Sequence, residues 1–246
     1  MKTIAVYSIK GGVGKTAASV NLAYYAAKAG KKVLIWDLDP QAAATFYFRV
    51  KPKIKKGIKK TVQGKRDIDD DIKATDYENL DIIPSDFSYR KLDIFLDAED
   101  KSKKRIGDIL KPLQDEYDVV ILDAPPGITL LSEALIQAAD ILAVPIIPTV
   151  LSQRTSEMLT SYLKENDMKK VRPALFFSMV DRRKKIHREV MEDPGIKRIK
   201  LLESFIPYSA DVERMGTNRE PVGAFSPWCR ASRAYKTLWE ELEAIL

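Results

Sequence analysis

The chain has 246 residues, of which 45% are hydrophobic and 31% charged, which is the composition of a globular protein with one large domain. No apolar run approaches the ~20 residues of a membrane-spanning helix, and a formal net charge of +6 permits an anionic partner without naming one. The single cysteine excludes a disulfide scaffold or a Cys-rich metal site within one chain, and the lack of a secretory signal at the amino terminus favours the cytoplasm.

Short apolar runs alternate with helix-like segments along most of the chain. The first run, Lys2–Ser8, is followed by glycines and by an Ala- and Leu-rich helix predicted over Lys15–Ala29. Further strands are predicted at Val33–Trp36, Leu80–Ile83, Val119–Leu122, Ile141–Val144, Ala174–Phe177 and Ile199–Phe205. This alternation predicts an α/β fold over residues 1–246, with a mostly parallel, twisted sheet flanked by helices on both faces.

The least regular stretch, residues 50–105, is segregated by charge. Residues 51–66 carry seven lysines and one arginine with no acid, whereas residues 67–100 carry twelve acids and three bases. Like-charge runs are usually solvated faces, so we expect a surface insertion whose two halves attract each other. A nucleic-acid or adaptor contact is the alternative.

A glycine-rich loop joins the first predicted strand to the first predicted helix. Ile9–Thr16 reads I-K-G-G-V-G-K-T, and such glycines let backbone N–H groups point at phosphate oxygens while the following helix adds its positive dipole end. In a P-loop, Lys15 would reach the β- and γ-phosphates and Thr16 could ligate Mg²⁺. The strict pattern G-x-x-x-x-G-K-T fails because Ile9 replaces its first glycine, and a second lysine, Lys10, precedes the others.

Acidic residues follow two other predicted strands. D-L-D-P-Q occupies residues 37–41, and Asp123 ends the run V-V-I-L-D. The carboxyl ends of parallel strands meet at the edge where open α/β sheets bind ligands, and Asp123 has the position of a Walker B carboxylate. One such aspartate alone would be expected to cap a helix or a turn, but the three elements in this order favour a nucleotide site.

These motifs resemble those of the ParA/MinD family of deviant Walker A P-loop ATPases. The resemblance is carried by K-G-G-V-G-K-T, D-L-D-P-Q and V-V-I-L-D-A-P-P-G, and it is closest to the ParA branch. It extends to E-N-L-D-I-I-P-S-D at residues 78–86, F-F-S-M-V-D-R-R at 176–183 and the tail at 206–242, and it is weakest over residues 50–73. It implies ATP and Mg²⁺ as cofactors and a slow ATP hydrolysis that a partner stimulates.

The resemblance also implies roles for single residues. Lys10 would cross to the partner's ATP in a nucleotide-sandwich homodimer, Lys15 would contact phosphate in its own subunit, and Asp39 would orient the attacking water. Mg²⁺ would be held by Thr16, Asp39 and Asp123. The nucleotide would be bound by Gly11, Gly12, Val13, Gly14, Lys15, Thr16 and Ala17, with adenine contacts from Met179, Asp181 and Pro207.

Three classes of protein can use such a core. In the first, which resembles ParA, the ATP-bound dimer binds nonspecific nucleoid DNA, and a ParB-like or other cargo-borne adaptor stimulates hydrolysis. Its job would be to segregate or position a plasmid, a chromosome origin or a protein organelle. The candidate DNA contacts are Arg182, Arg183, Lys184, Lys185, Arg188 and Arg219, and further bases follow at Arg230, Arg233 and Lys236.

The other two classes fit the sequence less well. A MinD-like protein would bind membrane through a basic amphipathic carboxyl-terminal helix, but residues 238–246 carry three glutamates and no base. We therefore expect no membrane association and a last helix that packs on the body. Enzymes that phosphorylate or amidate small molecules form the third class, and no second substrate pocket is recognisable.

Two residues with reactive side chains receive structural interpretations. His187, the only histidine, has no His or Cys nearby in the sequence with which it could bind a metal, so we expect a surface residue. Cys229 is expected to be a buried or half-buried structural residue.

Overall fold

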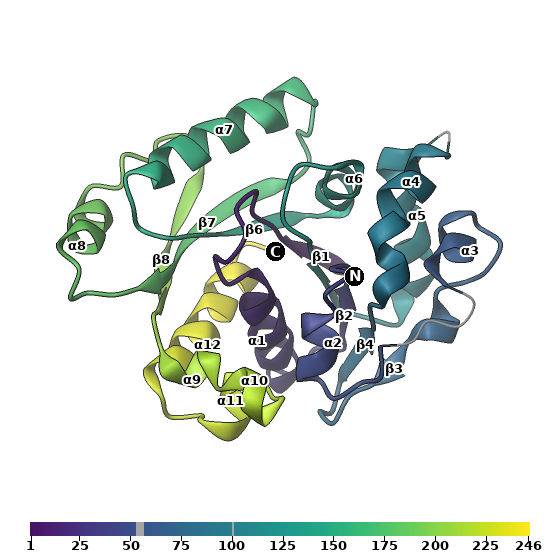
Figure 1. Ribbon diagram of the computed structural model, residues 1–246, viewed down its shortest axis with the longest axis horizontal. Coiled ribbons are helices and arrows are strands. Elements are labelled where there is room, and N and C mark those ends of the chain that lie inside the picture. Colours follow the sequence, from purple (N-terminus) through teal and green to yellow (C-terminus); the bar gives the residue numbers. More distant parts are fainter. Residues whose placement is uncertain (53–56, 100) are drawn as a thin grey trace.

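The computed structural model describes residues 1–52, 57–99 and 101–246 (Figure 1). Among these residues one sheet has the strand order β3-β4-β2-β5-β1-β6-β7-β8, and all neighbours are parallel except β3 and β4. The strands are β1 (Lys2–Val6), β2 (Val33–Asp37), β3 (Lys73–Ala74), β4 (Leu80–Ile83), β5 (Val119–Asp123), β6 (Ile141–Ile146), β7 (Arg172–Val180) and β8 (Lys200–Pro207). The predicted α/β class and mostly parallel sheet are confirmed.

Helices cover both faces of this sheet (Figure 1). One face packs against α1 (Lys15–Lys28) and α12 (Arg230–Glu243), and the other against α4 (Leu92–Asp97), α5 (Arg105–Leu110), α6 (Leu130–Ala138) and α7 (Leu151–Glu165). The remaining helices are α2 (Ala43–Tyr47), α3 (Ile58–Val62), α8 (Lys185–Glu192), α9 (Ala210–Glu213), α10 (Met215–Asn218) and α11 (Val222–Phe225).

The central strands are apolar throughout because both of their faces are covered. Every residue of β2 and β5 is buried. In β1, Ile4 and Val6 pack on the side of α1 and α12, whereas Ala5 belongs to the other cluster. This alternation is the two-residue period of a strand, so the central strands β1, β2 and β5 each contribute to two hydrophobic cores.

The charged stretch is only partly the solvated insertion that we expected. Ile58, Val62 and Ile68 are buried in the core, so this part of the chain is anchored to the body. The two halves do attract each other, because Arg66 of the basic half forms an ion pair with the buried Asp71 of the acidic half. Lys53, Lys55, Lys56 and Asp100 of the predicted charge runs lie outside the described residues.

The carboxyl-terminal helix packs on the body, as predicted. Tyr235, Leu238, Trp239 and Leu242 of α12 are all buried against the sheet and α1. Their spacing of three or four residues forms one apolar stripe, the pattern of a helix that covers a core. Within the described residues, no helix combines the length and the apolar character needed to cross a bilayer.

Candidate functional site

The glycine-rich loop forms an open turn at the carboxyl end of β1. Gly12 and Gly14 have positive φ angles of 72° and 89°, which glycine adopts without steric cost. A Cβ on Gly14 would also lie only 3.0 Å from the Ser178 Oγ, whereas one on Gly11 or Gly12 would meet no described atom within 4 Å. The loop therefore needs glycine at positions 12 and 14, and it borders open space at positions 11 and 12.

The first turn of α1 is arranged to receive an anion. Among the described residues no side chain caps its N–H groups, and the turn carries no acid. The first N–H groups of a helix have no partner within the helix, and the helix dipole adds positive potential at this end. A phosphate group would accept hydrogen bonds from these N–H groups, and the positive potential would stabilise its negative charge.

The two lysines of the loop differ in environment. Lys15 is only 7% exposed, with its Nζ 3.5 Å from the carbonyl oxygen of Lys10. Burial lowers the pKa of Lys15, while the carboxylates of Asp123 and Asp39 act in the opposite direction. The residue Lys10 is exposed at the loop. Lys15 is thus directed inward toward the carboxylates, and Lys10 stands at the surface.

Asp123 ends β5 directly beside the ends of two neighbouring strands, paired in register with Val6 of β1 and Asp37 of β2. Its Oδ1 accepts a hydrogen bond of 2.8 Å from the Ser19 hydroxyl, but its buried Oδ2 has no hydrogen-bond partner among the described residues. Burial, reinforced by Asp37, raises the pKa of Asp123, and the nearby hydroxyls of Ser19 and Thr16 oppose the rise. A bound cation would give Oδ2 a partner, and it would stabilise the charged carboxylate that burial disfavours.

Asp37 has a structural role that the sequence analysis did not assign. Its Oδ2 accepts hydrogen bonds from the backbone N–H (2.8 Å) and the hydroxyl (2.7 Å) of Thr45 on α2. The Thr45 hydroxyl in turn accepts from the Ser85 N–H at 2.9 Å. Asp37 and Thr45 are both fully buried, so this network fixes α2 to the end of β2.

Asp39 lies on the loop between these two elements. It is half-buried, and its Oδ1 accepts a hydrogen bond of 2.9 Å from the N–H of Gln41. The three predicted metal ligands therefore lie at the carboxyl edge of the sheet: Thr16 in the first turn of α1, Asp39 on the loop after β2 and Asp123 at the end of β5. Hydroxyl and carboxylate oxygens are the ligands that Mg²⁺ prefers, so the residues present fit a magnesium ion beside a phosphate chain.

The predicted adenine contacts lie where β7 and β8 end. Val180 and Pro207 pair in register, and the N–H of Tyr208 donates to the carbonyl of Val180 at 2.9 Å, which brings Asp181 and Pro207 together. Met179 has a positive φ of 56°. Because Ser178 approaches Gly14, this corner of the sheet adjoins the glycine-rich loop.

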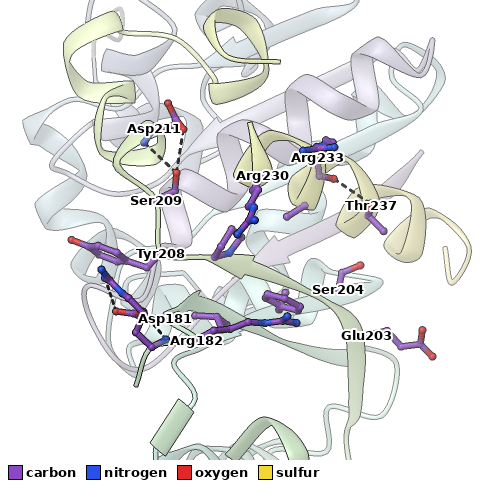
Figure 2. Close-up of a pocket in the computed structure, with 15 residues that line it drawn as sticks. Asp181, Arg182, Glu203, Ser204, Tyr208, Ser209, Asp211, Arg230, Arg233 and Thr237 are labelled. Atoms are coloured by element: carbon purple, nitrogen blue, oxygen red, sulfur yellow. Dashed lines mark hydrogen bonds and ion pairs between the residues drawn. The ribbon is translucent and has the colours of Figure 1, made fainter. Parts of the chain in front are cut away.

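A groove of about 880 Å³ opens at this corner (Figure 2). Arg182 lies on one side, and Arg230 and Arg233 of α12 lie across from it. Arg183 also lines the groove, and we call the groove formed by these four residues the arginine groove. The Arg182 guanidinium lies 5.0 Å from the centre of the Phe205 ring. Arg183 forms two hydrogen bonds of 2.9 Å with Asp181, which holds the pKa of that carboxyl near 2.

The other candidate DNA contacts fall into two groups, one next to this groove and one away from it. Lys184 and Lys185 begin α8, and Arg188 donates to the carbonyls of Arg182 and Arg183, at 2.7 and 3.2 Å. Arg219 lies elsewhere, since its guanidinium stacks 4.5 Å above the Phe46 ring of α2. The structure therefore separates Arg219 from the cluster at residues 182–188.

The expectation that His187 lies at the surface is wrong. The residue is 4% exposed, and its Nδ1 accepts a hydrogen bond of 3.1 Å from the N–H of Asp181. Burial and the nearby Lys184 lower its pKa. The imidazole turns inward because it supplies an acceptor for the backbone at the start of the basic loop. Cys229 is half-buried, as predicted, and its Sγ accepts from the Ser232 N–H at the start of α12.

Two supporting residues were missed by the sequence analysis. Ser19 follows Lys15 by four residues, and this spacing places both side chains on one face of a helix. The sequence therefore did contain a signal for Ser19. Thr45 carries no such signal, because its bond to Asp37 joins residues in different elements eight positions apart.

Comparisons with known proteins identify relatives in sequence and in fold. The AAA domain family matches residues 1–175. The sporulation initiation inhibitor protein Soj of Bacillus subtilis is 30% identical over 252 residues, which cover 99% of this chain and 98% of Soj. The virulence plasmid ParA family protein pGP5-D of Chlamydia psittaci is 33% identical over 254 residues, covering 99% and 95%. Among solved structures, the septum site-determining protein MinD from Pyrococcus horikoshii, complexed with Mg-ADP, has a TM-score of 0.82 at 20% identity, covering 99% and 96%.

Proposed function

The chain belongs to the ParA family of ATPases, and on that premise we propose that it is an ATP-dependent dimeric switch that binds DNA without sequence preference. Partner-stimulated ATP hydrolysis would release the dimer from nucleoid DNA and thereby segregate or position a cargo. The observation that carries the proposal is the glycine-rich loop close to the arginine groove, together with the buried Asp123 Oδ2, which has no hydrogen-bond partner in the described part of the chain.

The nucleotide half of the proposal rests on the loop and its two aspartates. Residues 11–17 would bind the phosphates through backbone N–H groups, and Lys15 would neutralise their charge. Thr16, Asp39 and Asp123 would hold Mg²⁺, which supplies charge neutralisation on the phosphate oxygens. Asp39, which is half-buried whereas Asp123 is fully buried, would orient the attacking water. The Mg-ADP complex of the MinD neighbour supports this arrangement.

The dimer would complete the site. Lys10 is exposed at the loop, where its side chain could reach the nucleotide of a second copy. A cation supplied in trans stabilises the charge that develops during phosphoryl transfer. Removing Lys10 is thus expected to impair hydrolysis and dimer assembly while single subunits still bind ATP.

The DNA half rests on the arginine groove and on the lysines at the start of α8. Arginines from two elements face one hollow, and guanidinium groups bind phosphate with two parallel hydrogen bonds. Contacts to backbone phosphates release counterions, so affinity would fall steeply with salt and depend little on sequence.

The decisive experiment is a salt titration of binding to a random-sequence DNA duplex with ATP and Mg²⁺, with ADP and Mg²⁺, and without nucleotide. We expect binding with ATP only, falling by ~10³ or more between 50 and 200 mM salt if six or more phosphates are contacted. Lys15→Ala is the control for nucleotide dependence. Equal binding in all three states would refute the switch.

Anionic liposomes in the same experiment test the MinD-like alternative, a membrane-associated positioning ATPase. The apolar stripe of α12 is buried in the core and would have to leave it to enter a bilayer. We therefore expect no sedimentation with liposomes. Liposome binding without DNA binding would replace the proposal with the MinD-like one.

A further inference from the structure

Two arginines join α2 to residues 215–222, the segment that follows α9. Arg49, just after α2, donates to the carbonyl of Asn218 at 3.1 Å and forms an ion pair with Glu220. In the opposite direction, the Arg219 Nε donates to the carbonyl of Phe46 at 3.2 Å, and its guanidinium covers the Phe46 ring. Each arginine thus bonds to the backbone of the other segment. We call this pair, with Phe46, the arginine clasp.

The clasped segment is also tied to the helix that follows the glycine-rich loop. Asn21 of α1 donates from its Nδ2 to the Met215 Sδ at 3.3 Å and accepts at its Oδ1 from the Val222 N–H at 2.9 Å. Residues 215–222 are therefore attached to α1 at both ends and to α2 in between (Figure 1). A change in the position of α2 relative to α1 would alter this segment first.

Helix α2 is also attached to the end of β2, beside the nucleotide site. Thr45 is held by the buried Asp37, and the next residue, Phe46, carries Arg219. Asp39 lies between Asp37 and α2. The N–H of Asp39 donates to Asp37 Oδ1 at 3.2 Å, so a rearrangement of Asp39 around a metal and nucleotide would be transmitted through Asp37, Thr45 and Phe46 to Arg219.

We propose that the arginine clasp couples the nucleotide site to DNA binding by controlling Arg219. Arg219 is half-buried, and its guanidinium stacks on the Phe46 ring. This ring contact competes with phosphate for the guanidinium. Movement of residues 37–45 on ATP binding opens the clasp and frees Arg219 for DNA. This inference rests on the proposed function, nucleotide-dependent binding of DNA, and adds Arg219 as a separate DNA contact.

Phe46→Ala tests the clasp, because Phe46 is 46% exposed and its loss leaves the core intact. The ratio of DNA affinities with and without a non-hydrolysable ATP analogue should fall by about tenfold, within the 5- to 150-fold range of typical couplings, through tighter binding without nucleotide. Arg49→Ala should act in the same direction. Arg219→Ala should instead weaken DNA binding with the analogue.

A matched control is available in the same chain. Phe87 is 67% exposed, and the Arg90 guanidinium lies 4.0 Å from the centre of its ring. Phe87 lies in the charged stretch and is not part of the clasp. Phe87→Ala should leave the affinity ratio unchanged. Because coupling is reciprocal, DNA should raise the affinity of the unchanged protein for the analogue by the same factor, and Phe46→Ala should reduce that factor equally.

The outcomes separate the two proposals. If the unchanged protein binds DNA only with ATP and Phe46→Ala keeps the full affinity ratio, the clasp is refuted and the proposed function stands. If the unchanged protein binds no DNA in any nucleotide state, both are refuted. A reduced ratio in Phe46→Ala and Arg49→Ala, with Phe87→Ala unchanged, would support the clasp. Circular dichroism of each variant confirms that the fold is retained.

Discussion

Replacing Thr45 by valine should destabilise the protein strongly, although the two side chains have almost the same shape. The Thr45 hydroxyl donates to the buried carboxylate of Asp37 at 2.7 Å and accepts from the Ser85 N–H at 2.9 Å. Losing a hydrogen bond to a charged group costs about 1.5–3 kcal/mol, and leaving a buried N–H without a partner costs about 1–3 kcal/mol. We expect Thr45→Val to lower the free energy of unfolding by about 3 kcal/mol, since the Thr45 N–H still donates to Asp37.

Chemical denaturation followed by circular dichroism measures this difference, and Thr45→Ser is the matched control. Serine keeps the hydroxyl and loses one buried methyl group, so it should cost only about 1 kcal/mol. The penalty should also depend on pH. Burial raises the pKa of Asp37 to about 6, so its charged form, which the hydroxyl favours, is lost as the pH falls through that value.

We therefore expect the difference between Thr45→Val and the unchanged protein to be larger near pH 8 than near pH 5. If Thr45→Val proved as stable as Thr45→Ser at the higher pH, the Asp37–Thr45–Ser85 network would not hold α2 as described. The same result would weaken the argument that α2 transmits changes at Asp39 to the arginine clasp.

Two further predictions concern supporting residues. Ser19→Ala removes the only described hydrogen-bond donor to Asp123 Oδ1, and the loss of such a supporting contact typically lowers metal affinity about 10- to 100-fold. Calorimetric titration of ATP with and without Mg²⁺ should show this loss only when the metal is present, and an equal loss in both would contradict the role of Asp123. His187, as the single histidine, should titrate in the NMR spectrum below its ordinary pKa of 6.5, because its fold favours the neutral ring. The stabilisation that the buried, neutral His187 provides is therefore complete above pH 6.5 and declines below it. A measured pKa at or above 6.5 would contradict its burial.

Much of the fold could be predicted because the buried strands leave a strong local signal. Runs such as Val33–Trp36 and Val119–Leu122 are apolar on both faces, and the glycines around Lys15 mark where a strand turns into a helix. The two-residue strand β3 was missed. Lys73 and Ala74 have no apolar pattern, and only their antiparallel pairing with β4 makes them a strand.

The candidate site was predictable as far as its motifs are local. Asp37 and Asp123 each end an apolar run, but their register across the sheet depends on a strand order that no local pattern contains. The position of Arg219 could not be predicted for the same reason. Its basic character was visible in the sequence, whereas its place on Phe46 joins residues more than 170 positions apart.

Helix α12 has two faces with separate tasks. Its apolar stripe seals one core, while Arg230 and Arg233 at its amino-terminal end face the arginine groove. Exposed residues on a helix can usually be exchanged at a cost below about 0.5 kcal/mol, whereas its buried residues cannot. The exposed arginines of α12 can therefore be exchanged with little effect on folding. Deleting the helix, by contrast, would expose the core, so point substitutions rather than truncations are the means to alter the groove.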